Sequence, residues 1–175
     1  MTRIDLKDVL ARTVNTVYGD LVTRRTGEAV RSGIEAMLGD DDETAIIDFG
    51  TVRLMDISCA DEIVGKLLLQ QGTARYFLLA GVHAAHEDAL EPVLERHHLA
   101  VVAEDRTGAL KLLGSLPDPA RRAFQMLATS GPAALDEIAV GLSLAPDEAR
   151  HALETLRQHR VVREAGGHYQ ALRCA

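Results

Sequence analysis

Residues 44–64 constrain the fold of this chain more than any other stretch of the sequence. The segment begins with Thr44–Asp48, a run with β-branched residues at its centre that is typical of a strand. A short linking segment follows, and from Ser58 onward apolar residues recur at the spacing of a helix. The first residues of such a helix lie beside unpaired backbone N–H groups and the positive end of the helix dipole. The segment therefore predicts a place that holds a phosphate or presents a serine to a kinase.

The residues of this segment resemble the STAS family, the sulfate-transporter and anti-sigma-factor-antagonist domain. The family signature places Met-Asp-Ser-Ser-Gly before a helix, and Met55–Cys59 aligns with it. Ile57 stands in place of the first serine, and Cys59 stands in place of the glycine. A divergent branch, the STAS-like domains of unknown function, has a relaxed form of this pattern. The residues that fit the relaxed form are Asp48, Phe49, Val52 and Ser58–Glu62.

The resemblance implies that Ser58 is the serine phosphorylated in regulatory members, and that the partner is a kinase or an anti-sigma-type regulator. An ordinary helix N-cap accounts for the same serine, since Ser58 with Asp61 and Glu62 nearly forms a capping box. The two roles are compatible. A phosphate on Ser58 gains the helix dipole but meets Asp56 and the two other carboxylates, so it would act as an off-switch for a partner surface.

Strands and helices alternate through the first two thirds of the chain. We expect one or two strands within residues 3–17, further strands at 44–48, 76–80 and 99–102, and helices at 21–38, 58–71, 84–97 and 107–113. Right-handed crossovers between such elements imply a mostly parallel or mixed sheet. The predicted fold class is α/β, with a STAS-like mixed sheet covered by helices.

The pattern of elements changes after the segment Ser-Leu-Pro-Asp-Pro at residues 115–119. Helices are expected at 119–130, 135–142 and 146–159, followed by a hairpin of 161–164 and 168–172 around two glycines. This order resembles the winged helix-turn-helix. We therefore predict a STAS-like domain over residues 1–114, a linker over 115–119, and a small winged helix-turn-helix domain over 120–175.

A second segment of unusual composition lies at the start of the first long helix. Arg24 and Arg25 stand at this helix start in an otherwise acidic domain, and Asp20 lies where STAS domains often have an acidic residue near the serine. Together with Asp56 and Asp61, these residues are candidates for contact with a partner or an anion. A solvated arginine face is the alternative. A small enzyme or ligand carrier with an Arg24/Arg25 cleft is a third function that the segment leaves open.

The distribution of charge bears on whether the second domain binds DNA. The net charge is −7, and the excess of acidic residues lies within residues 1–114, which argues against nucleic-acid binding there. The expected recognition helix begins with Asp147 and Glu148, which face phosphate unfavourably. Arg157, Arg160 and Arg163, at its far end and in the wing, are the candidates for nucleic-acid contact. DNA contact stays open beside protein contact and homodimer formation.

The sequence lacks the motifs of the common enzyme and metal-binding classes. It contains no GxGxxG or GK[ST] loop, no HExxH helix, and no strand–turn context for a serine or cysteine nucleophile. We therefore expect no catalytic residue, no metal and no cofactor. No apolar run approaches the roughly 20 residues that cross a bilayer, and the first residues have no apolar signal core. These features predict a cytoplasmic protein that does not enter a membrane, with Cys59 and Cys174 reduced.

The function predicted from these features is that of a cytoplasmic regulatory protein that acts by protein–protein interaction. Phosphorylation of Ser58 would switch the interaction, and the winged helix would serve as the output domain. The alternative is a sequence-specific DNA-binding transcriptional regulator whose STAS-like domain serves for dimerisation or sensing.

Overall fold

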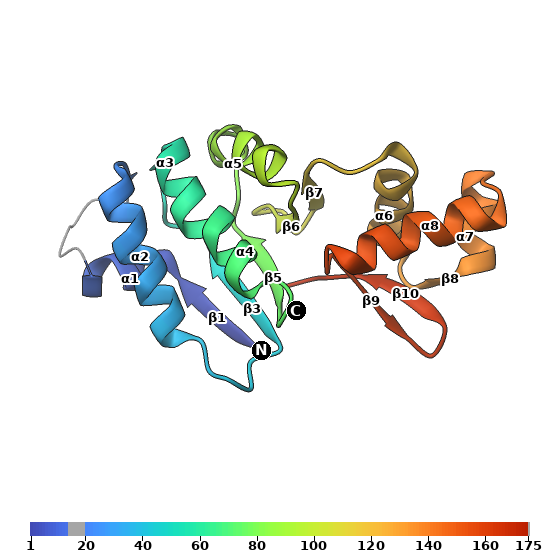
Figure 1. The fold of residues 1–175 in the computed structure, drawn as a ribbon, viewed down its shortest axis with the longest axis horizontal. Helices are drawn as coiled ribbons and strands as arrows, with labels where there is room; N and C mark the ends of the chain where they lie inside the picture. Colours follow the sequence, from blue (N-terminus) through green and yellow to red (C-terminus); the bar gives the residue numbers. More distant parts are fainter. Residues whose placement is uncertain (14–19, 175) are drawn as a thin grey trace.

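The computed structural model describes residues 1–13 and 20–174 (Figure 1). Its main sheet has five strands in the order β1-β3-β5-β6-β7. These strands are β1 (Thr2–Asp5), β3 (Thr44–Asp48), β5 (Tyr76–Ala80), β6 (Ala100–Glu104) and β7 (Leu110–Gly114). The first four run parallel to one another, and β7 pairs antiparallel with β6. The structure thus confirms an α/β class with a mixed sheet.

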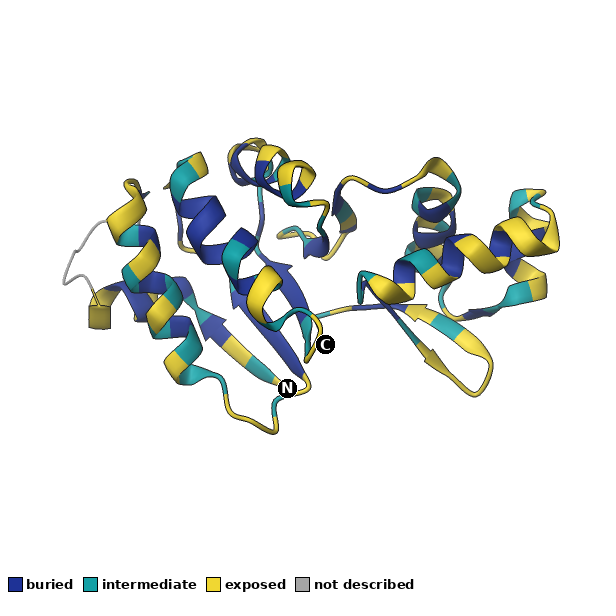
Figure 2. Cartoon of the chain, viewed as in Figure 1, coloured by how far each residue is buried: buried dark blue, intermediate teal, exposed yellow. Residues whose placement is uncertain are grey.

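Helices from the first part of the chain pack on one face of this sheet. They are α1 (Leu6–Thr13), α2 (Arg24–Met37), α3 (Ile57–Ala60), α4 (Lys66–Gln71) and α5 (Ala84–His97). Because successive strand residues point to opposite faces, Ala45, Ile47 and Leu79 point toward the helices and share their apolar core. Figure 2 shows this layer as buried strands under helices whose outer sides are exposed.

The helix after β3 is interrupted by a turn of π-helix. This turn, Asp61–Gly65, joins α3 to α4, so the chain is helical without a break from residue 57 to 71. All five residues of the π turn are buried, including its two carboxylates, Asp61 and Glu62. Such turns are rare and occur frequently at functional sites.

The C-terminal part of the chain contains three helices and a second, smaller sheet. Its elements are α6 (Asp118–Ser130), β8 (Ala133–Ala134), α7 (Leu135–Leu142), α8 (Pro146–Gln158), β9 (Val162–Ala165) and β10 (His168–Ala171). The three strands pair antiparallel in the order β8-β10-β9. Gly166 and Gly167 join β9 to β10 with φ angles of 58° and 79°, a conformation that side chains disfavour.

The second face of the main sheet lies against the C-terminal elements. Ile46, Leu78 and Val102 on this face are buried in one apolar cluster with Phe124 of α6 and Leu172. After β10 the chain returns to the sheet, where the backbone N–H of Cys174 donates to Oε2 of Glu104 at 3.1 Å (Figure 1). The predicted division at 115–119 therefore separates two parts that share apolar contacts, and their independent folding stays a prediction.

One local prediction of secondary structure is wrong, and a second is confirmed only in part. Residues 107–113 were expected to be helical, but Leu110–Gly114 is strand β7, because its pairing with β6 outweighs the short-range pattern. One or two strands were expected within residues 3–17, and β1 is one strand there, but the residues after it form a helix. Leu6, Val9 and Leu10 have helical spacing and bury one side of α1; residues 14–17 lie outside the described residues.

Candidate functional site

The candidate site lies where α2 and α3 begin next to each other. Two short parallel strands, β2 (Asp20–Leu21) and β4 (Leu54–Met55), lead the chain into these two helices. The backbone N–H of Asp56 donates to the carbonyl of Leu21 at 2.9 Å, which extends this pairing to the helix starts. Both N-termini are therefore held side by side by backbone hydrogen bonds.

Asp56, and not Ser58, is the N-cap of α3. Its Oδ1 accepts the backbone N–H of Cys59 at 2.7 Å, and its backbone is extended, as a cap requires. Ser58 is the second residue of the helix, is half-buried, and donates its hydroxyl to the same Oδ1 at 2.8 Å. The capping role predicted for Ser58 thus belongs to the carboxylate of Asp56, two residues earlier. The Ser58 hydroxyl lies in the first turn of the helix.

The carboxylate of Asp56 also holds the start of α2. Its Oδ2 accepts the backbone N–H of Thr23 at 3.0 Å. Burial alone would raise the pKa of Asp56, but hydrogen bonds from Thr23, Cys59 and Ser58 outweigh it and hold that pKa below its usual value. Asp56 is therefore a charged acceptor shared by two helix starts and one hydroxyl.

Thr23, the N-cap of α2, has an unusual backbone conformation. Its φ is 86° and its ψ is 136°, a region that β-branched residues rarely adopt. Its Oγ1 accepts the backbone N–H of Thr26 at 3.4 Å, and its carbonyl accepts the thiol of Cys59 at 3.0 Å. Contacts on both sides of the residue, together with Asp56, hold this conformation in place.

An ion-pair network with buried carboxylates and partly exposed cations joins α2 to the π turn. Nη1 of Arg24 lies 2.7 Å from Oε1 of Glu62 and 3.0 Å from Oδ2 of Asp61. Nζ of Lys66 lies 2.5 Å from Oε1 of Glu62, whose side chain is 0% exposed. Nε2 of His97 contacts Oδ1 of Asp61 at 2.9 Å. Arg24 and Asp61, both predicted to contact a partner, thus bind each other.

The other residues proposed for partner contact lie apart from this network. Asp20 pairs with Arg53, with Oδ2 and Nη2 2.9 Å apart. Arg25 is exposed, and no hydrogen bond or ion pair joins it to another residue within 1–13 and 20–174. In this arrangement Arg24 neutralises buried carboxylates, which argues against an anion-binding cleft shared by Arg24 and Arg25.

An open hollow of about 500 Å³ lies beside Ser58. It is lined by Met55, Asp56, Ile57, Ser58, Ala85, Asp88 and Ala89. Three apolar side chains of the β2/β4 strands and the helix start are exposed: Leu54 at 53%, Ile57 at 48% and Val22 at 47%. This surface was not predicted from the sequence, although Ile57, in place of a serine, was its visible signal. Exposed apolar side chains, one of which lines the hollow, favour contact with another protein.

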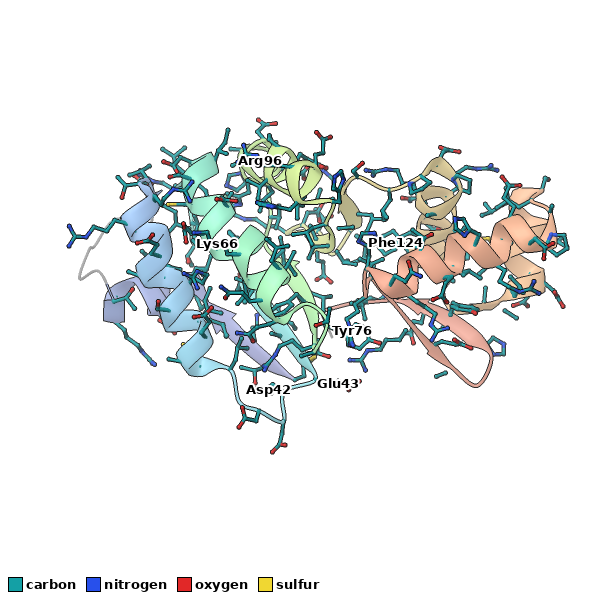
Figure 3. The ribbon with its side chains drawn as sticks, in the orientation of Figure 1. Asp42, Glu43, Lys66, Tyr76, Arg96 and Phe124 are labelled. Atoms are coloured by element: carbon teal, nitrogen blue, oxygen red, sulfur yellow. The ribbon has the colours of Figure 1, made fainter. Side chains whose placement is uncertain are left out.

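The three arginines proposed to contact nucleic acid are engaged within the chain. Nη1 of Arg157 lies 3.3 Å from Glu154 and 3.2 Å from Glu164. Arg160 and Arg163 lie over the ring of Tyr76, with Cζ 5.2 Å and 4.5 Å from its centre. Figure 3 shows Tyr76 where the sheet approaches the C-terminal elements.

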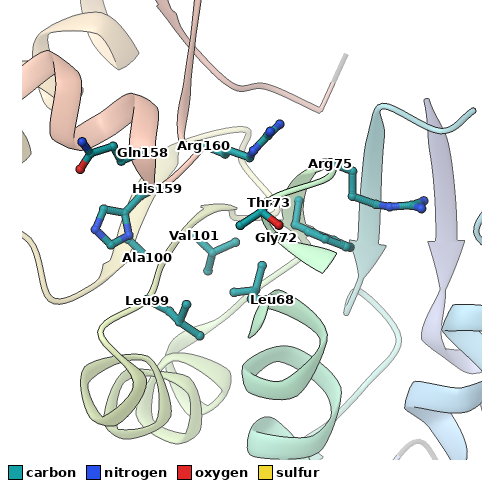
Figure 4. Close-up of a pocket in the computed structure, with 11 residues that line it drawn as sticks. Leu68, Gly72, Thr73, Arg75, Leu99, Ala100, Val101, Gln158, His159 and Arg160 are labelled. Atoms are coloured by element: carbon teal, nitrogen blue, oxygen red, sulfur yellow. The ribbon is translucent and has the colours of Figure 1, made fainter. Parts of the chain in front are cut away.

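The turn after α8 also borders a small pocket of about 100 Å³. Figure 4 shows Gln158, His159 and Arg160 across this pocket from Leu68 and Val101. The pocket is therefore a gap between the two parts of the chain, and its size is too small for a typical ligand.

Cys59 places a thiol at the site, where it donates to the carbonyl of Thr23. Burial, with the nearby charge of Asp56 adding to it, raises the pKa of the Cys59 thiol to about 12, so the thiol stays protonated at neutral pH. Within the described residues, no group of three or more His, Cys, Asp or Glu side chains is arranged to hold a metal ion.

Comparisons with protein-family models, curated proteins and solved structures give no match to this chain. Among the helices of residues 1–13 and 20–174, none has the length and apolar character needed to span a membrane. A function for this chain therefore has to be inferred from its residues and their contacts.

Proposed function

We propose that this chain is a cytoplasmic regulatory protein that acts by protein–protein contact at the surface around Ser58. Phosphorylation of Ser58 switches that contact, and the C-terminal elements serve as the output. The supporting observation is that Ser58 lines a hollow together with the exposed side chain of Ile57, while Val22 and Leu54, on the paired segments that lead into the two helices, are exposed as well. A serine beside an exposed apolar surface is placed so that a modification changes what the surface binds.

The switch follows from the charge that a phosphate adds. A serine kinase transfers the γ-phosphoryl group of ATP: a bond forms between Ser58 Oγ and phosphorus, and the bond to the ADP oxygen breaks. The hydroxyl proton passes to a base of the kinase. The product carries close to two negative charges beside Asp56, and Asp88 lines the same hollow. Only a cation on the partner could pair with this charge. A partner that places apolar residues against the unmodified surface has no such cation there, so the phosphate displaces it.

The chemistry of the surface also limits the partner. Apolar side chains surround two carboxylates, and the whole chain carries a net charge of −7. Such a surface fits a partner that presents apolar residues and no cation opposite Ser58. A kinase or an anti-sigma-type regulator is the class of partner that the STAS resemblance implies.

The experiment compares three variants of the full chain in binding. A pull-down with wild-type protein identifies the partner by mass spectrometry, and titration with the purified partner then measures affinity. Ser58→Asp is expected to weaken binding roughly tenfold or more, because a carboxylate is then buried against an apolar partner surface with no cation to pair with it. Ser58→Ala is expected to bind as wild type does. Thr73→Asp, which adds the same charge at an exposed position after α4, is the matched control.

Equal affinity of Ser58→Asp and Ser58→Ala for the purified partner would contradict the switch. Equal weakening by Thr73→Asp would also contradict it, because the effect would then come from net charge and not from the position of Ser58.

A further inference from the structure

We infer that Asp56 relays the phosphorylation of Ser58 to the start of α2. The inference rests on the proposed function and adds how the signal leaves the modified residue. The two oxygens of Asp56 have separate partners: Oδ1 accepts from Ser58 Oγ and Cys59 N at 2.8 and 2.7 Å, and Oδ2 accepts from Thr23 N at 3.0 Å. One carboxylate thus connects the serine to a second helix.

The second helix begins at a residue that is held in a strained conformation. With φ at 86°, Thr23 adopts a backbone conformation that β-branched residues leave unless their surroundings hold them. Two of the restraints come from the α3 side: Asp56 accepts the Thr23 N–H, and the Cys59 thiol donates to the Thr23 carbonyl. The start of α2 therefore depends on the start of α3.

Phosphorylation changes the partners of Asp56. The new O–P bond replaces the O–H donor of Ser58, so the hydroxyl no longer donates to Oδ1. A phosphate dianion then lies beside a carboxylate that hydrogen bonds hold in its charged form. The backbone N–H groups at the start of the 57–71 helix attract the dianion, which competes with Asp56 for Cys59 N. Repulsion moves Asp56 away, and Thr23 N loses its acceptor.

The release of Thr23 alters the surface that the partner contacts. Without Asp56, Thr23 relaxes to an ordinary φ, and the first turn of α2 loses its cap. That turn carries Arg24, whose ion pairs with Asp61 and Glu62 hold α2 against the π turn. The neighbouring Val22 belongs to the exposed apolar surface. The phosphate thus changes the shape of this surface as well as its charge.

Hydrogen exchange tests the relay without a kinase or a partner. Phosphoserine is introduced at position 58 of the full chain during translation, and amide exchange is measured by mass spectrometry and NMR. We expect the amides of residues 23–27 to exchange at least about tenfold faster, because a hydrogen bond to a charged group is lost. The amides of 100–171 are expected to exchange as in wild type. Ser58→Ala, which leaves both backbone hydrogen bonds of Asp56 intact, is expected to match wild type.

Substitution of Asp56 separates a relay from an ordinary cap. Asp56→Ala is expected to speed exchange at residues 23–27 by a similar factor, and phosphoserine in that background is expected to add nothing further at Thr23. Asp42→Ala is the matched control, because Asp42 also binds a backbone N–H, that of Gly39 at 3.0 Å, away from this site. It is expected to leave 23–27 unchanged.

Three outcomes decide the inference. If phosphoserine leaves exchange at 23–27 unchanged but abolishes partner binding, the relay is wrong and the proposed function stands. If exchange rises at 23–27 while the partner binds as before, the relay stands and the proposed function is wrong. If Asp56→Ala speeds exchange equally in 100–171, Asp56 is only a structural cap, and the relay is wrong.

Discussion

Cζ of Arg163 lies 4.5 Å from the centre of the Tyr76 ring, which joins the C-terminal hairpin to the first residue of β5. The same guanidinium donates from Nη2 to Oγ1 of Thr44 and lies 3.5 Å from the carboxylate of Glu43. Thr44 and Arg163 are separated by 119 positions in the sequence. The C-terminal elements are therefore held to the sheet by a polar contact in addition to the shared apolar cluster.

We predict that Tyr76→Ala destabilises the protein and that Tyr76→Phe largely does not. The aromatic face that attracts Arg160 and Arg163 is kept in phenylalanine and lost in alanine. We expect a difference of about 1 to 3 kcal/mol between the two variants in the free energy of unfolding. Urea unfolding followed by circular dichroism measures it. A double-mutant cycle with Arg163→Ala should give a coupling of about 0.5 to 1 kcal/mol; a coupling of zero contradicts the contact.

Substitution of Gly27 tests how closely α2 approaches the following helix. A Cβ atom at Gly27 would lie 2.9 Å from Cβ of Glu62 and 3.0 Å from Cα of Cys59. Because backbone cannot move aside cheaply, Gly27→Ala is expected to destabilise the protein by about 1 to 3 kcal/mol despite the better helix propensity of alanine. Gly39→Ala is the matched control, since its Cβ would meet only the Asp42 carboxylate, at 3.4 Å. Equal stability of both variants would show that α2 has room to shift.

Helices and strands with a strong periodic pattern could be predicted from the sequence. The strand at 76–80 and the helices at 84–97 and 135–142 have the predicted bounds. Residues 107–113 could not be assigned in this way, because Leu110, Leu112 and Leu113 suit a helix turn as well as a strand. Pairing with the preceding strand β6, a contact that the local apolar pattern does not reveal, makes Leu110–Gly114 a strand.

The candidate site could be predicted only in part, for the same reason. A serine at the start of a helix follows from the local pattern, and the structure places Ser58 in the first turn. Asp56 and Ser58 are both good capping residues two positions apart, so the pattern alone could not choose between them. The hydrogen bond from Thr23 to Asp56 and the ion pairs of Arg24 link distant positions, which no local pattern contains.

His86 makes the stability of the fold depend on pH. Its ring is fully buried, and Nε2 lies 3.1 Å from the carbonyl of Val52. Burial and then the charge of His83 lower the pKa of His86 from 6.5 to about 4. The unfolded chain therefore takes up the proton first as pH falls. The neutral, buried form of His86 contributes about 3 kcal/mol to the free energy of unfolding. This contribution is complete above pH 6.5 and is lost as the pH falls from 6.5 to 4.

The variant His86→Gln tests this dependence, because glutamine keeps an N–H donor but does not titrate. We expect the variant to be less stable than wild type above pH 6.5 and to lose less stability between pH 6.5 and 4. Urea unfolding over this pH range measures both curves. His168→Gln, at an exposed position of β10, is the control and should follow wild type. Parallel curves for wild type and His86→Gln would contradict the neutral buried imidazole.

DNA binding by the C-terminal elements is tested by its dependence on salt. Arg157 is paired with two glutamates, and Arg160 and Arg163 lie against Tyr76, so few cations are free to replace counterions on a duplex. We expect wild type and Arg157→Ala/Arg163→Ala to show no salt-dependent affinity for a labelled duplex in fluorescence anisotropy. Asp147→Lys/Glu148→Lys, which places cations at the start of α8, is the positive control and should bind without sequence preference.

The opposite result would support the DNA-binding regulator. In that case wild type binds the duplex at low salt, and the slope of log affinity against log salt falls by about one for each phosphate contact that the arginine substitutions remove. Loss of binding to every duplex alike would place Arg157 and Arg163 on phosphates, because phosphate contacts carry no sequence information. Flat curves for wild type and the arginine variant, beside binding by the lysine variant, would leave protein contact as the function of these elements.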